Sequence, residues 1–576
     1  MFGGNRRNPQ RPNHGQSLGL AVGLIIALLG SSGGAFGQQR PPSVEPGVIE
    51  RQFQPTPQPR APGPVEVPPS PAEQPVPAIA PNVRVELKGV DISGATVFGP
   101  ADFQPLYADL IGHSVALEQI YALAAQITTK YHNAGYFLSQ AIVPPQEIAG
   151  GFVRIRVVEG YVAHVQIQGE VRGLRSIIEG YGNKIAADRP ARERTFERYL
   201  LLMNDLPGVT AHATLAPNPT EVGAADLIVE VRHKTESLSA SADNRGTKFI
   251  GPYEFRGGAS LNSLAGLYDR IDVQYIGTPI FDELRYGDLR YTQPIGDEGF
   301  RTELFGSLST THPRGTLSSQ NIHGDARTVS VAGFYPIERS RLENLTLGGG
   351  FALQDATTNQ LGVRATDDRM RYLSLTGQYD SSDNWAGNNL VYLEMRQGIN
   401  GLGASNSSDL LSNPGARPDF ALAHATVQRQ QDLGALLSGL AILAAADGQY
   451  AFTKLVVPQQ YAFGGEQYGR AYDPAEITGD HGIAAKVEPQ YTFAGIPSYV
   501  DTLQAYSFYD FGYVARISPV AGTAQTATGA ATGAGLRFFA PYFFGDLEVA
   551  HALTRGVSDN EGRKETRFFF RLTAKY

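Results

Sequence analysis

The sequence predicts a transmembrane antiparallel β-barrel of about 16 strands, preceded by two small α+β units. Three observations lead to this prediction. The chain begins with an export signal, residues 235–576 consist of short segments in which apolar and polar residues alternate, and the final strand ends on an aromatic residue. Together they indicate a protein that leaves the cytoplasm and crosses a membrane with strands.

The export signal is a predicted signal peptide covering residues 1–37. Its first eleven residues carry three arginines, Arg6, Arg7 and Arg11. An apolar run follows at residues 18–29, and a small-x-small cleavage site at residues 35–37 precedes Gln38. The run is shorter than the roughly twenty residues that a transmembrane helix needs. This favours a cleaved precursor over a membrane anchor.

Composition excludes several kinds of partner and chemistry. The net charge is -8 and no cluster of Lys and Arg forms a basic stripe, so we expect no nucleic-acid partner. The chain has no cysteine, which excludes disulfides and thiolate catalysis and suits an oxidising compartment. No nucleotide-binding, zinc-protease or serine-hydrolase motif occurs, and the 11 histidines are scattered. We therefore expect no catalytic, cofactor-binding or metal-binding residues, and no enzyme.

No later window supplies a membrane-spanning helix. The nearest, residues 433–446, stops at Asp447. Because only helices and closed barrels can span a bilayer, the exported chain is either soluble or a barrel.

Residues 38–81 form a predicted proline-rich linker. Fourteen prolines fall between Pro41 and Pro81, a density typical of an extended, solvated spacer. One short island, residues 47–54 (GVIERQFQ), has the composition for a turn or two of helix.

Residues 82–234 contain the same β-α-α-β-β pattern twice, at 82–160 and 161–234. In the first unit we expect strands at 83–90, 137–144 and 152–162 and helices at 101–110 and 116–133. In the second we expect strands at 163–169, 209–217 and 225–234 and helices at 174–181 and 191–203. This order resembles the POTRA domain, a periplasmic module that precedes outer-membrane barrels in tandem copies. On pattern alone, residues 82–234 could also form another kind of α+β pair.

Residues 235–576 carry the barrel pattern. The clearest two-faced segments are residues 269–277, 300–309, 369–380 and 388–398. Such alternation of about ten residues places lipid on one face and a polar lumen on the other. At about twenty residues per strand with its share of loop, the segment suits sixteen to eighteen strands, enough for an aqueous lumen. A soluble β-sandwich also alternates, but the export signal, the length and the last strand argue against it.

The last strand reads RFFFRLTAKY. Its apolar face carries Phe568, Phe570 and Leu572, and it ends on Tyr576. The strand resembles the C-terminal recognition strand of bacterial outer-membrane proteins. That resemblance implies outer-membrane lipids as surroundings and the barrel-assembly machinery as a partner during biogenesis.

A lone arginine stands in FGGEQYGRAYDP, in a long loop of the predicted barrel. If this loop folds into the lumen, Arg470 needs an anionic partner there. Asp510, about forty residues on, faces inward if Tyr509 and Phe511 meet lipid. A bidentate pair between Arg470 and Asp510 would hold the loop inside the channel.

These two stretches resemble the paired signatures of the two-partner secretion transporters, the TpsB or haemolysin secretion/activation family. That family has a lumen-loop motif Val-Arg-Gly-Phe/Tyr, and this chain reads Gly469, Arg470, Ala471 and Tyr472. The altered neighbours of the arginine put the path of the loop backbone in doubt. The facing strand motif, Phe/Gly-x-Asp-x-Gly, is fully matched by Phe508, Asp510 and Gly512.

The resemblance covers nearly the whole predicted mature chain. It implies export of an unfolded partner exoprotein, of haemolysin or adhesin type, from the periplasm to the surface of a Gram-negative bacterium. It also implies that an N-terminal helix can plug the pore, and residues 47–54 lie where that helix would be.

Three alternatives stay open. A barrel-assembly or autotransporter-assembly factor shares the motifs but generally carries more POTRA repeats. A passive porin would not need two periplasmic repeats. A surface hydrolase would need a catalytic constellation that the sequence lacks.

Overall fold

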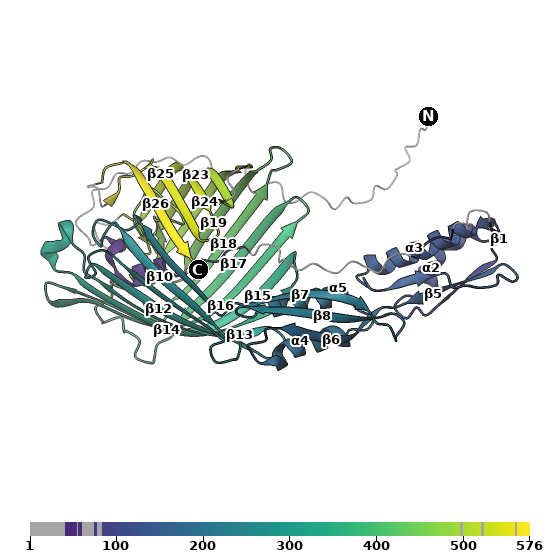
Figure 1. Cartoon of the computed structure of the whole chain (residues 1–576). Coiled ribbons are helices and arrows are strands. Elements are labelled where there is room, and N and C mark those ends of the chain that lie inside the picture. The colour runs from purple at the N-terminus through teal and green to yellow at the C-terminus, as the bar shows by residue number, and fades with distance from the viewer. Residues whose placement is uncertain are drawn as a thin grey trace, which may run out of the picture.

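A closed barrel with an arm of two α/β units makes up the computed structural model (Figure 1). The structure describes residues 41–54, 56–59, 74–77, 83–495, 499–519, 524–558 and 562–576. The predicted signal peptide, residues 1–37, lies outside the described residues, as does much of the predicted linker. Within the described ranges, none of the helices has both the length and the apolar composition to cross a membrane.

The first unit packs helices against two small sheets. Its elements are β1 (Arg84–Glu86), β2 (Gly89–Ser93), α2 (Pro100–Tyr107), η3 (Ala108–Leu110), β3 (Ser114–Ala116), α3 (Leu117–Asn133), β4 (Gln140–Ile142) and β5 (Phe152–Val158). The order β2–β5–β4 forms one sheet, and β1 pairs with β3. The apolar stripe of α3 is buried against the sheet, as its helical spacing predicts, through residues such as Ile120, Leu123 and Ile127.

Three expected strands of this unit differ from the structure. The expected strand 83–90 is divided because the chain changes partner: Leu87 N–H bonds His113, and Lys88 N–H bonds Gly151. The expected strand 137–144 keeps only β4, because Ser139 N–H turns back to the Tyr136 carbonyl. The expected strand 152–162 is two strands, one in each unit.

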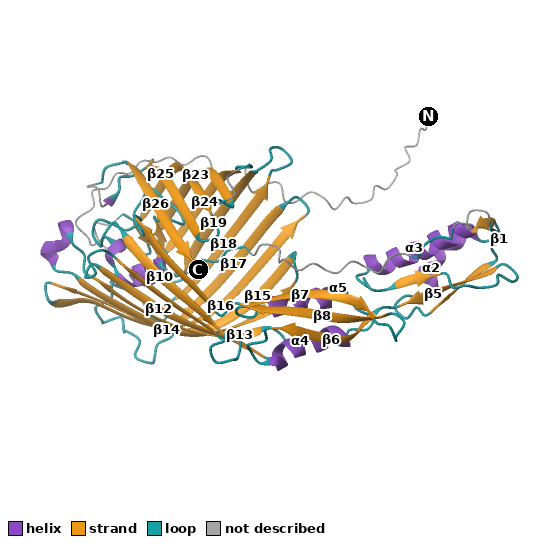
Figure 2. Ribbon diagram, in the orientation of Figure 1, coloured by secondary structure: helices purple, strands orange, loops and turns teal. Residues whose placement is uncertain are grey.

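The second unit repeats the order of the first. Its elements are β6 (Tyr161–Gly169), α4 (Arg175–Ala187), α5 (Glu193–Asn204), β7 (Val209–Pro217) and β8 (Ala224–His233). The sheet order is β6–β8–β7, with β6 and β8 parallel. The helices cover one face of this sheet, and Figure 2 shows that helix is otherwise confined to the first unit and to short turns in the barrel.

Sixteen antiparallel strands close the barrel, which confirms the predicted strand number. They are β9 (Glu236–Asp243), β10 (Glu254–Asn262), β11 (Arg270–Gly277), β12 (Leu284–Ile295), β13 (Phe300–Thr311), β14 (His323–Arg339), β15 (Glu343–Gln360), β16 (Val363–Asp383), β17 (Gly387–Gly398), β18 (Ala421–Asp432), β19 (Leu440–Ala451), β22 (His481–Thr492), β23 (Thr502–Ala515), β24 (Thr526–Phe539), β25 (Phe543–Ala552) and β26 (Thr566–Lys575). The last strand, β26, pairs with the first, β9, over five residues.

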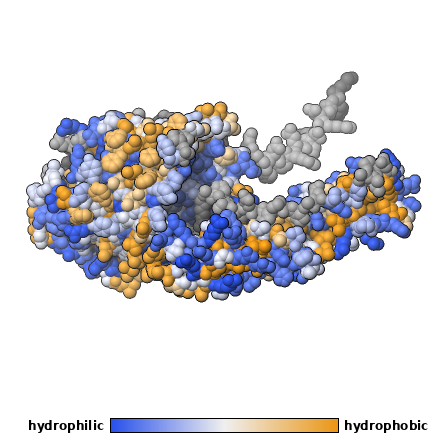
Figure 3. All heavy atoms as spheres, viewed as in Figure 1, coloured by the Kyte–Doolittle hydropathy of each residue, from blue (hydrophilic) through white to orange (hydrophobic). Residues whose placement is uncertain are grey.

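Side chains alternate between the outside and the lumen. Val273 and Tyr275 are exposed on the outside, and so are Phe568 and Leu572 of the last strand. Apolar residues gather over the outer wall in Figure 3, whereas the hollow beside the arm is hydrophilic. We call the barrel end next to β8 the near end and the opposite end the far end.

The second unit is joined to the near end of the barrel by ion pairs. Arg339, at the end of β14, donates two hydrogen bonds to Asp205, at 2.7 and 2.8 Å. Lys184 of α4 contacts Glu298 in the turn after β12 at 2.5 Å. Burial would raise the pKa of Glu298, but Lys184, Tyr199 and Arg198 together hold this pKa below its usual value. Further contacts join Arg194 to Glu338, Arg341 to Glu197, and Arg198 to the carbonyls of Pro336 and Ile337.

One aromatic side chain also crosses this junction. Tyr268, from the turn between β10 and β11, belongs to the hydrophobic core of the second unit and is fully buried. The barrel and the second unit therefore share both ionic and apolar contacts, which fix the arm at the mouth of the lumen.

Candidate functional site

The loop between β19 and β22, residues 452–480, folds back from the far end into the barrel. Two short strands, β20 (Tyr461–Phe463) and β21 (Ile477–Gly479), pair with each other and pack against β22, β23 and β24. Residues 469–480 are all buried. The loop is therefore an interior element, as the sequence predicts for the segment around Arg470. We call residues 452–480 the lumen loop.

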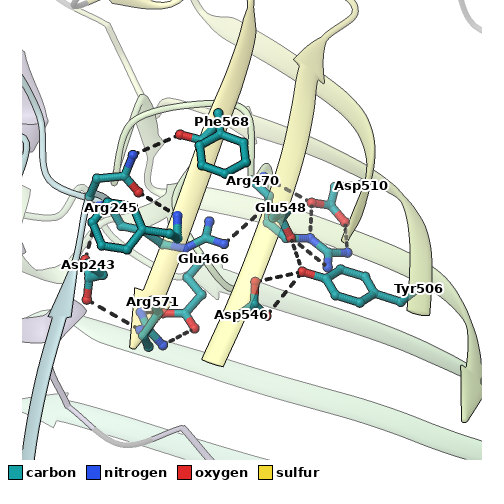
Figure 4. Close-up of polar contacts among 12 residues, drawn as sticks. Asp243, Arg245, Glu466, Arg470, Tyr506, Asp510, Asp546, Glu548, Phe568 and Arg571 are labelled. Atoms are coloured by element: carbon teal, nitrogen blue, oxygen red, sulfur yellow. Dashed lines mark hydrogen bonds and ion pairs between the residues drawn. The ribbon is translucent and has the colours of Figure 1, made fainter. Parts of the chain in front are cut away.

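Arg470 meets Asp510 on the inner face of β23. Arg470 Nε lies 3.1 Å from Asp510 Oδ2, and Arg470 Nη2 lies 2.9 Å from Asp510 Oδ1. The backbone N–H groups of Gly469 and Arg470 also donate to Asp510 Oδ2, at 3.1 and 3.0 Å. The exposed fractions are 4% for Arg470 and 0% for Asp510. One carboxylate thus holds both the side chain and the main chain of the loop (Figure 4).

Arg470 has further partners that the sequence analysis did not name. Its Nη1 donates to Glu488 of β22 and lies 3.7 Å from Glu548 of β25. Its guanidinium also stacks on the Phe508 ring, with the central carbon 3.5 Å from the ring centroid. Glu488 and Glu548 alternate inward on their strands, but this signal is shared by every lumen residue and does not single them out.

These acidic residues belong to a wider charge network in the wall. Arg537 donates to Glu488 at 2.6 Å, and Arg245 donates to Glu548 at 3.1 Å. The Tyr506 hydroxyl donates to Glu548 at 3.0 Å. Carboxylates that are out of water need such partners, since an unpaired buried charge is costly. Glu488 and Glu548 therefore each have a second cation beside Arg470, namely Arg537 and Arg245.

The glycine of the strand motif makes room for an aromatic ring of the loop. A Cβ atom on Gly512 would lie 2.1 Å from Phe463, and one on Gly529 of the next strand would lie 2.4 Å from the same ring. Phe463 is 1% exposed. The two glycines thus form a seat in the wall into which Phe463 fits, next to the ion pair.

The altered neighbours of Arg470 fit this backbone path. Gly469 has a φ of 81°, a conformation that glycine adopts without strain. Ala471 has a negative φ, so its position does not require the glycine of the family motif. The Tyr472 hydroxyl donates to the Ala530 carbonyl at 2.8 Å. These angles show that the loop backbone passes Arg470 without needing the valine and glycine of the family motif.

The lumen loop is also tied to the last strand. Arg571 of β26 donates to Glu466 at 2.5 and 2.6 Å and lies 3.4 Å from Asp243 of β9 (Figure 4). Arg567 of the same strand donates to Asp473 at 2.9 Å. Arg571 alternates with Phe570 and Leu572 along the strand, which predicts an inward side chain but not these contacts.

The predicted C-terminal signal residues lie as the alternation predicts. Phe568 and Leu572 are exposed on the outer wall, Phe570 is half-buried there, and Tyr576 is 69% exposed at the near end. Phe569, between them, is buried in the lumen.

A second interior element is the short helix α1 (Pro46–Gln52), which lies within the barrel in Figure 1. Ile49 of this helix and Phe53, which follows it, join a buried cluster with Tyr286 and other wall residues. Glu50 bonds Ser307 of β13 and, at 3.4 Å, Gln354 of β15. The helix covers most of the island that the sequence marked at residues 47–54.

The helix also touches the lumen loop. A Cβ atom on Gly47 would lie 2.8 Å from Pro458, which belongs to the short helix η5 (Val457–Gln459) of the loop. The close approach makes the helix and the loop one packed group inside the barrel.

An open cavity of about 800 Å³ lies along β9 to β13 and reaches the C-terminal residue Tyr576. Its lining is rich in small and charged residues, including Ser239, Gly257, Arg270 and Asp272. Two of the lining residues contact Phe53, which follows α1: the Tyr286 ring lies 5.0 Å from the Phe53 ring, and the Arg256 guanidinium lies 5.3 Å from it. The cavity therefore lies next to Phe53, at the C-terminal end of α1.

Among the residues that the structure describes, no group of three or more His, Cys, Asp or Glu side chains is arranged to hold a metal ion. The clusters described above consist of Arg, Asp and Glu in mutual ion pairs. Their arrangement holds chain segments in place.

Family models match two parts of the chain. Residues 223–536 match the haemolysin secretion/activation protein ShlB/FhaC/HecB, and residues 85–160 match the ShlB-type POTRA domain. The heme/hemopexin transporter protein HuxB of Haemophilus influenzae (strain 86-028NP) is 25% identical over 411 residues, covering 70% of this chain and 71% of HuxB. The outer membrane transporter CdiB of Escherichia coli is 23% identical over 481 residues, covering 78% and 76%.

Solved structures share the fold. CdiB from Escherichia coli aligns with a TM-score of 0.70 at 18% identity, over 87% of this chain and 92% of CdiB. BamA from Haemophilus ducreyi, lacking POTRA domains 1–3, aligns with a TM-score of 0.51 at 12% identity, over 85% of this chain and 99% of BamA. POTRA domains of this family are periplasmic, so the near end of the barrel faces the periplasm and the far end the cell surface. The chain belongs to the haemolysin secretion/activation family of ShlB, FhaC and HecB type, the outer-membrane transporters of two-partner secretion.

Proposed function

We propose that this chain moves an unfolded partner exoprotein, of haemolysin or adhesin type, from the periplasm to the cell surface. Its relatives include proteins described as hemolysin transporters, HpmB of Proteus mirabilis and ShlB of Serratia marcescens. HpmB is 28% identical over 269 residues.

The observation that carries the proposal is a cavity at the periplasmic end, lined by small, charged and apolar residues, that lies next to a removable element. The cavity of about 800 Å³ lies beside α1, a helix of seven residues held by a small apolar cluster and by the side-chain contacts of Glu50. A seven-residue helix has little stability of its own. It can leave when an extended chain enters, so α1 acts as a plug.

The lumen loop has the opposite character. Its own Arg470 is bound by Asp510 of the wall. Its Asp473 and Glu466 are bound by Arg567 and Arg571 of the last strand. We assign to Gly469, Arg470, Ala471 and Tyr472 the role of a fixed wall of the path, with Phe508, Asp510 and Gly512 as its seat. A fixed loop occupies the side of the lumen next to β22–β24. The client would then pass on the side that α1 occupies.

The physics of export needs no nucleotide. The POTRA domains offer sheet edges to which an extended client can add by main-chain hydrogen bonds. The client then threads a polar lumen as an unfolded chain. Folding outside buries apolar surface and makes return unfavourable.

The outer wall supports two further partners. Exposed apolar side chains such as Leu289, Leu375, Val427 and Leu547 fit the lipid tails of the outer membrane. Phe568, Phe570, Leu572 and Tyr576 of β26 form the segment that we propose for recognition by the barrel-assembly machinery.

The test searches for a large exoprotein gene next to the gene of this chain and pairs the two products. Both are expressed in a Gram-negative host that lacks other such transporters, and the exoprotein is measured in the medium and on the cell surface. We expect surface or secreted exoprotein only when the transporter is present. Exoprotein that stays periplasmic beside correctly inserted barrel would contradict the proposal.

A further inference from the structure

The outer edge of β4, in the first POTRA domain, is covered by a side chain from the linker. Val143 follows β4 directly, and its N–H donates to Gln74 Oε1 at 2.8 Å. Gln74 Nε2 donates back to the Val143 carbonyl at 3.0 Å. Two bonds to a single residue are the pattern of a hydrogen-bonded pair in an antiparallel ladder. The carboxamide of Gln74 thus takes the place that a peptide group of a neighbouring strand would take.

The geometry of β4 shows that this is its free edge. Ala141 pairs with Val157 of β5, yet its N–H donates to the Thr128 hydroxyl of α3, away from β5. N–H groups two residues apart point the same way along a strand, so Val143 also presents its N–H away from the sheet. Pro144 and Pro145 follow, and proline has no N–H. Within β4 and Val143, the outward N–H groups are those of Ala141 and Val143, and both are occupied.

The two occupants differ in origin. Thr128 belongs to α3 of the same domain and is buried. Gln74 comes from the proline-rich linker, 69 residues before Val143 in the chain. Its neighbours Pro75 and Pro77 cannot donate backbone hydrogen bonds, so the linker cannot add to the sheet as a strand. The contact therefore rests on one side chain and can be displaced by a polypeptide that offers backbone groups in sequence.

A second glutamine, Gln146, makes the same pair of hydrogen bonds within the domain itself. Gln146 donates to the Arg154 carbonyl at 2.7 Å and accepts from the Arg154 N–H at 2.8 Å. It lies eight residues from its partner and fills the place beside β5 where β4 has ended. Gln74 makes the same pair from a distant segment, on an edge where nothing of the domain itself continues the sheet.

We propose that Gln74 is a placeholder for the exported polypeptide. The outer edge of β4 at Val143 is the docking edge for an extended segment of the client, and the client displaces the Gln74 carboxamide to bind. This inference rests on the proposed function, since it names where an unfolded client first adds to the chain.

The test uses the full-length chain in detergent micelles and a fluorescein-labelled peptide, Lys-(Thr-Val)4-Lys, as a model extended strand. Binding is measured by fluorescence anisotropy. Gln74→Ala should tighten binding about fivefold, the effect of one or two net hydrogen bonds that no longer compete. The matched control is Gln58→Ala, because Gln58 lies on the same linker and its side chain contacts only Thr56 among the described hydrogen bonds. It should leave binding unchanged.

Two further measurements locate the edge. A peptide methylated on alternate backbone nitrogens should show no gain with Gln74→Ala. In the double variant Gln74→Ala/Val143→Pro the gain should disappear while hydrogen exchange elsewhere in residues 85–160 stays native. Hydrogen exchange of the Gln74→Ala chain alone should show faster exchange at the Val143 amide.

Unchanged peptide binding in Gln74→Ala, or a gain that survives methylation of the peptide, would overturn the inference. So would self-association of Gln74→Ala in place of peptide binding, because Gln74 would then only shield an edge from aggregation. Export of the exoprotein is scored separately. A chain that exports but shows no gain contradicts the role of Gln74 alone, and a gain without export contradicts the proposed function alone.

Discussion

The carboxylate of Asp510 accepts hydrogen bonds from the guanidinium of Arg470 and from the backbone N–H groups of Gly469 and Arg470. Side chain and main chain of the lumen loop are therefore held by the same group. Removing Asp510 releases both. Removing Arg470 takes one cation away from Glu488 and Glu548 as well as from Asp510.

We expect the two positions to be coupled in stability. Breaking a fully buried ion pair typically costs about 3–5 kcal/mol, and less where water enters. Arg470→Ala should cost more than Asp510→Ala because three carboxylates lose a partner, and the double variant should be little worse than Arg470→Ala. The thermal transition of the barrel in detergent measures these costs. Fully additive losses would show that the pair is not coupled.

Gly512 should tolerate no side chain. A methyl group there would meet Phe463, so Gly512→Ala should push the loop from its seat and cost about 1–3 kcal/mol, as overpacking does. Gly257→Ala on β10 is the matched control, since nothing lies within 4 Å of its Cβ position. The measurement is the thermal transition of both variants in detergent. Equal stability of the two would show that the contact between Gly512 and Phe463 does not hold the loop.

The plug role of α1 predicts an effect on conductance. Ile49 is 1% exposed in the apolar cluster, so Ile49→Asp would bury a charge and should expel the helix from the lumen. Gln52→Asp, at an exposed position of the same helix, should leave it in place. In planar bilayers, Ile49→Asp should raise the mean conductance several-fold, and the exoprotein should still be exported. Equal conductance of the two variants would mean that α1 does not close the path.

Arg339 should hold the POTRA arm at the mouth of the lumen. Arg339→Ala removes both hydrogen bonds to Asp205 and should broaden the distances between arm and barrel. Spin labels on cysteines introduced at Arg232 and Leu436 report these distances, and the chain has no native cysteine to interfere. Arg314→Ala, at the far end of the barrel, should leave the distribution unchanged. If this control broadens the distance distribution equally, the broadening comes from a general loss of rigidity and not from the contact between Arg339 and Asp205.

Much of this architecture follows from local patterns. Alternation along the strands predicts the barrel, its length predicts the strand number, and helical spacing predicts α3. The strand motif around Asp510 and the arginine in a glycine-rich loop predict a pair because they match two known signatures. Each of these signals is local and spans only a few residues of the sequence.

The rest depends on contacts that no local pattern encodes. Glu488 and Glu548 become partners of Arg470 only through the order and register of β22, β23 and β25. The tie between Glu466 and Arg571 joins residues 105 positions apart. The expected strand 83–90 was divided for the same reason, since Leu87 and Lys88 bond to different distant segments.

The central claim is that export requires the lumen loop to be held by Arg470. The most direct measurement is the rate of exoprotein export by Arg470→Ala at equal amounts of inserted barrel. Its matched control is Arg417→Ala, which removes an exposed loop arginine paired with Asp419 and should cost less than about 1 kcal/mol. The account predicts a loss of about tenfold or more for Arg470→Ala, since each 1.4 kcal/mol of lost anchoring shifts loop occupancy about tenfold, and export near the native rate for Arg417→Ala. Native export by Arg470→Ala would contradict it.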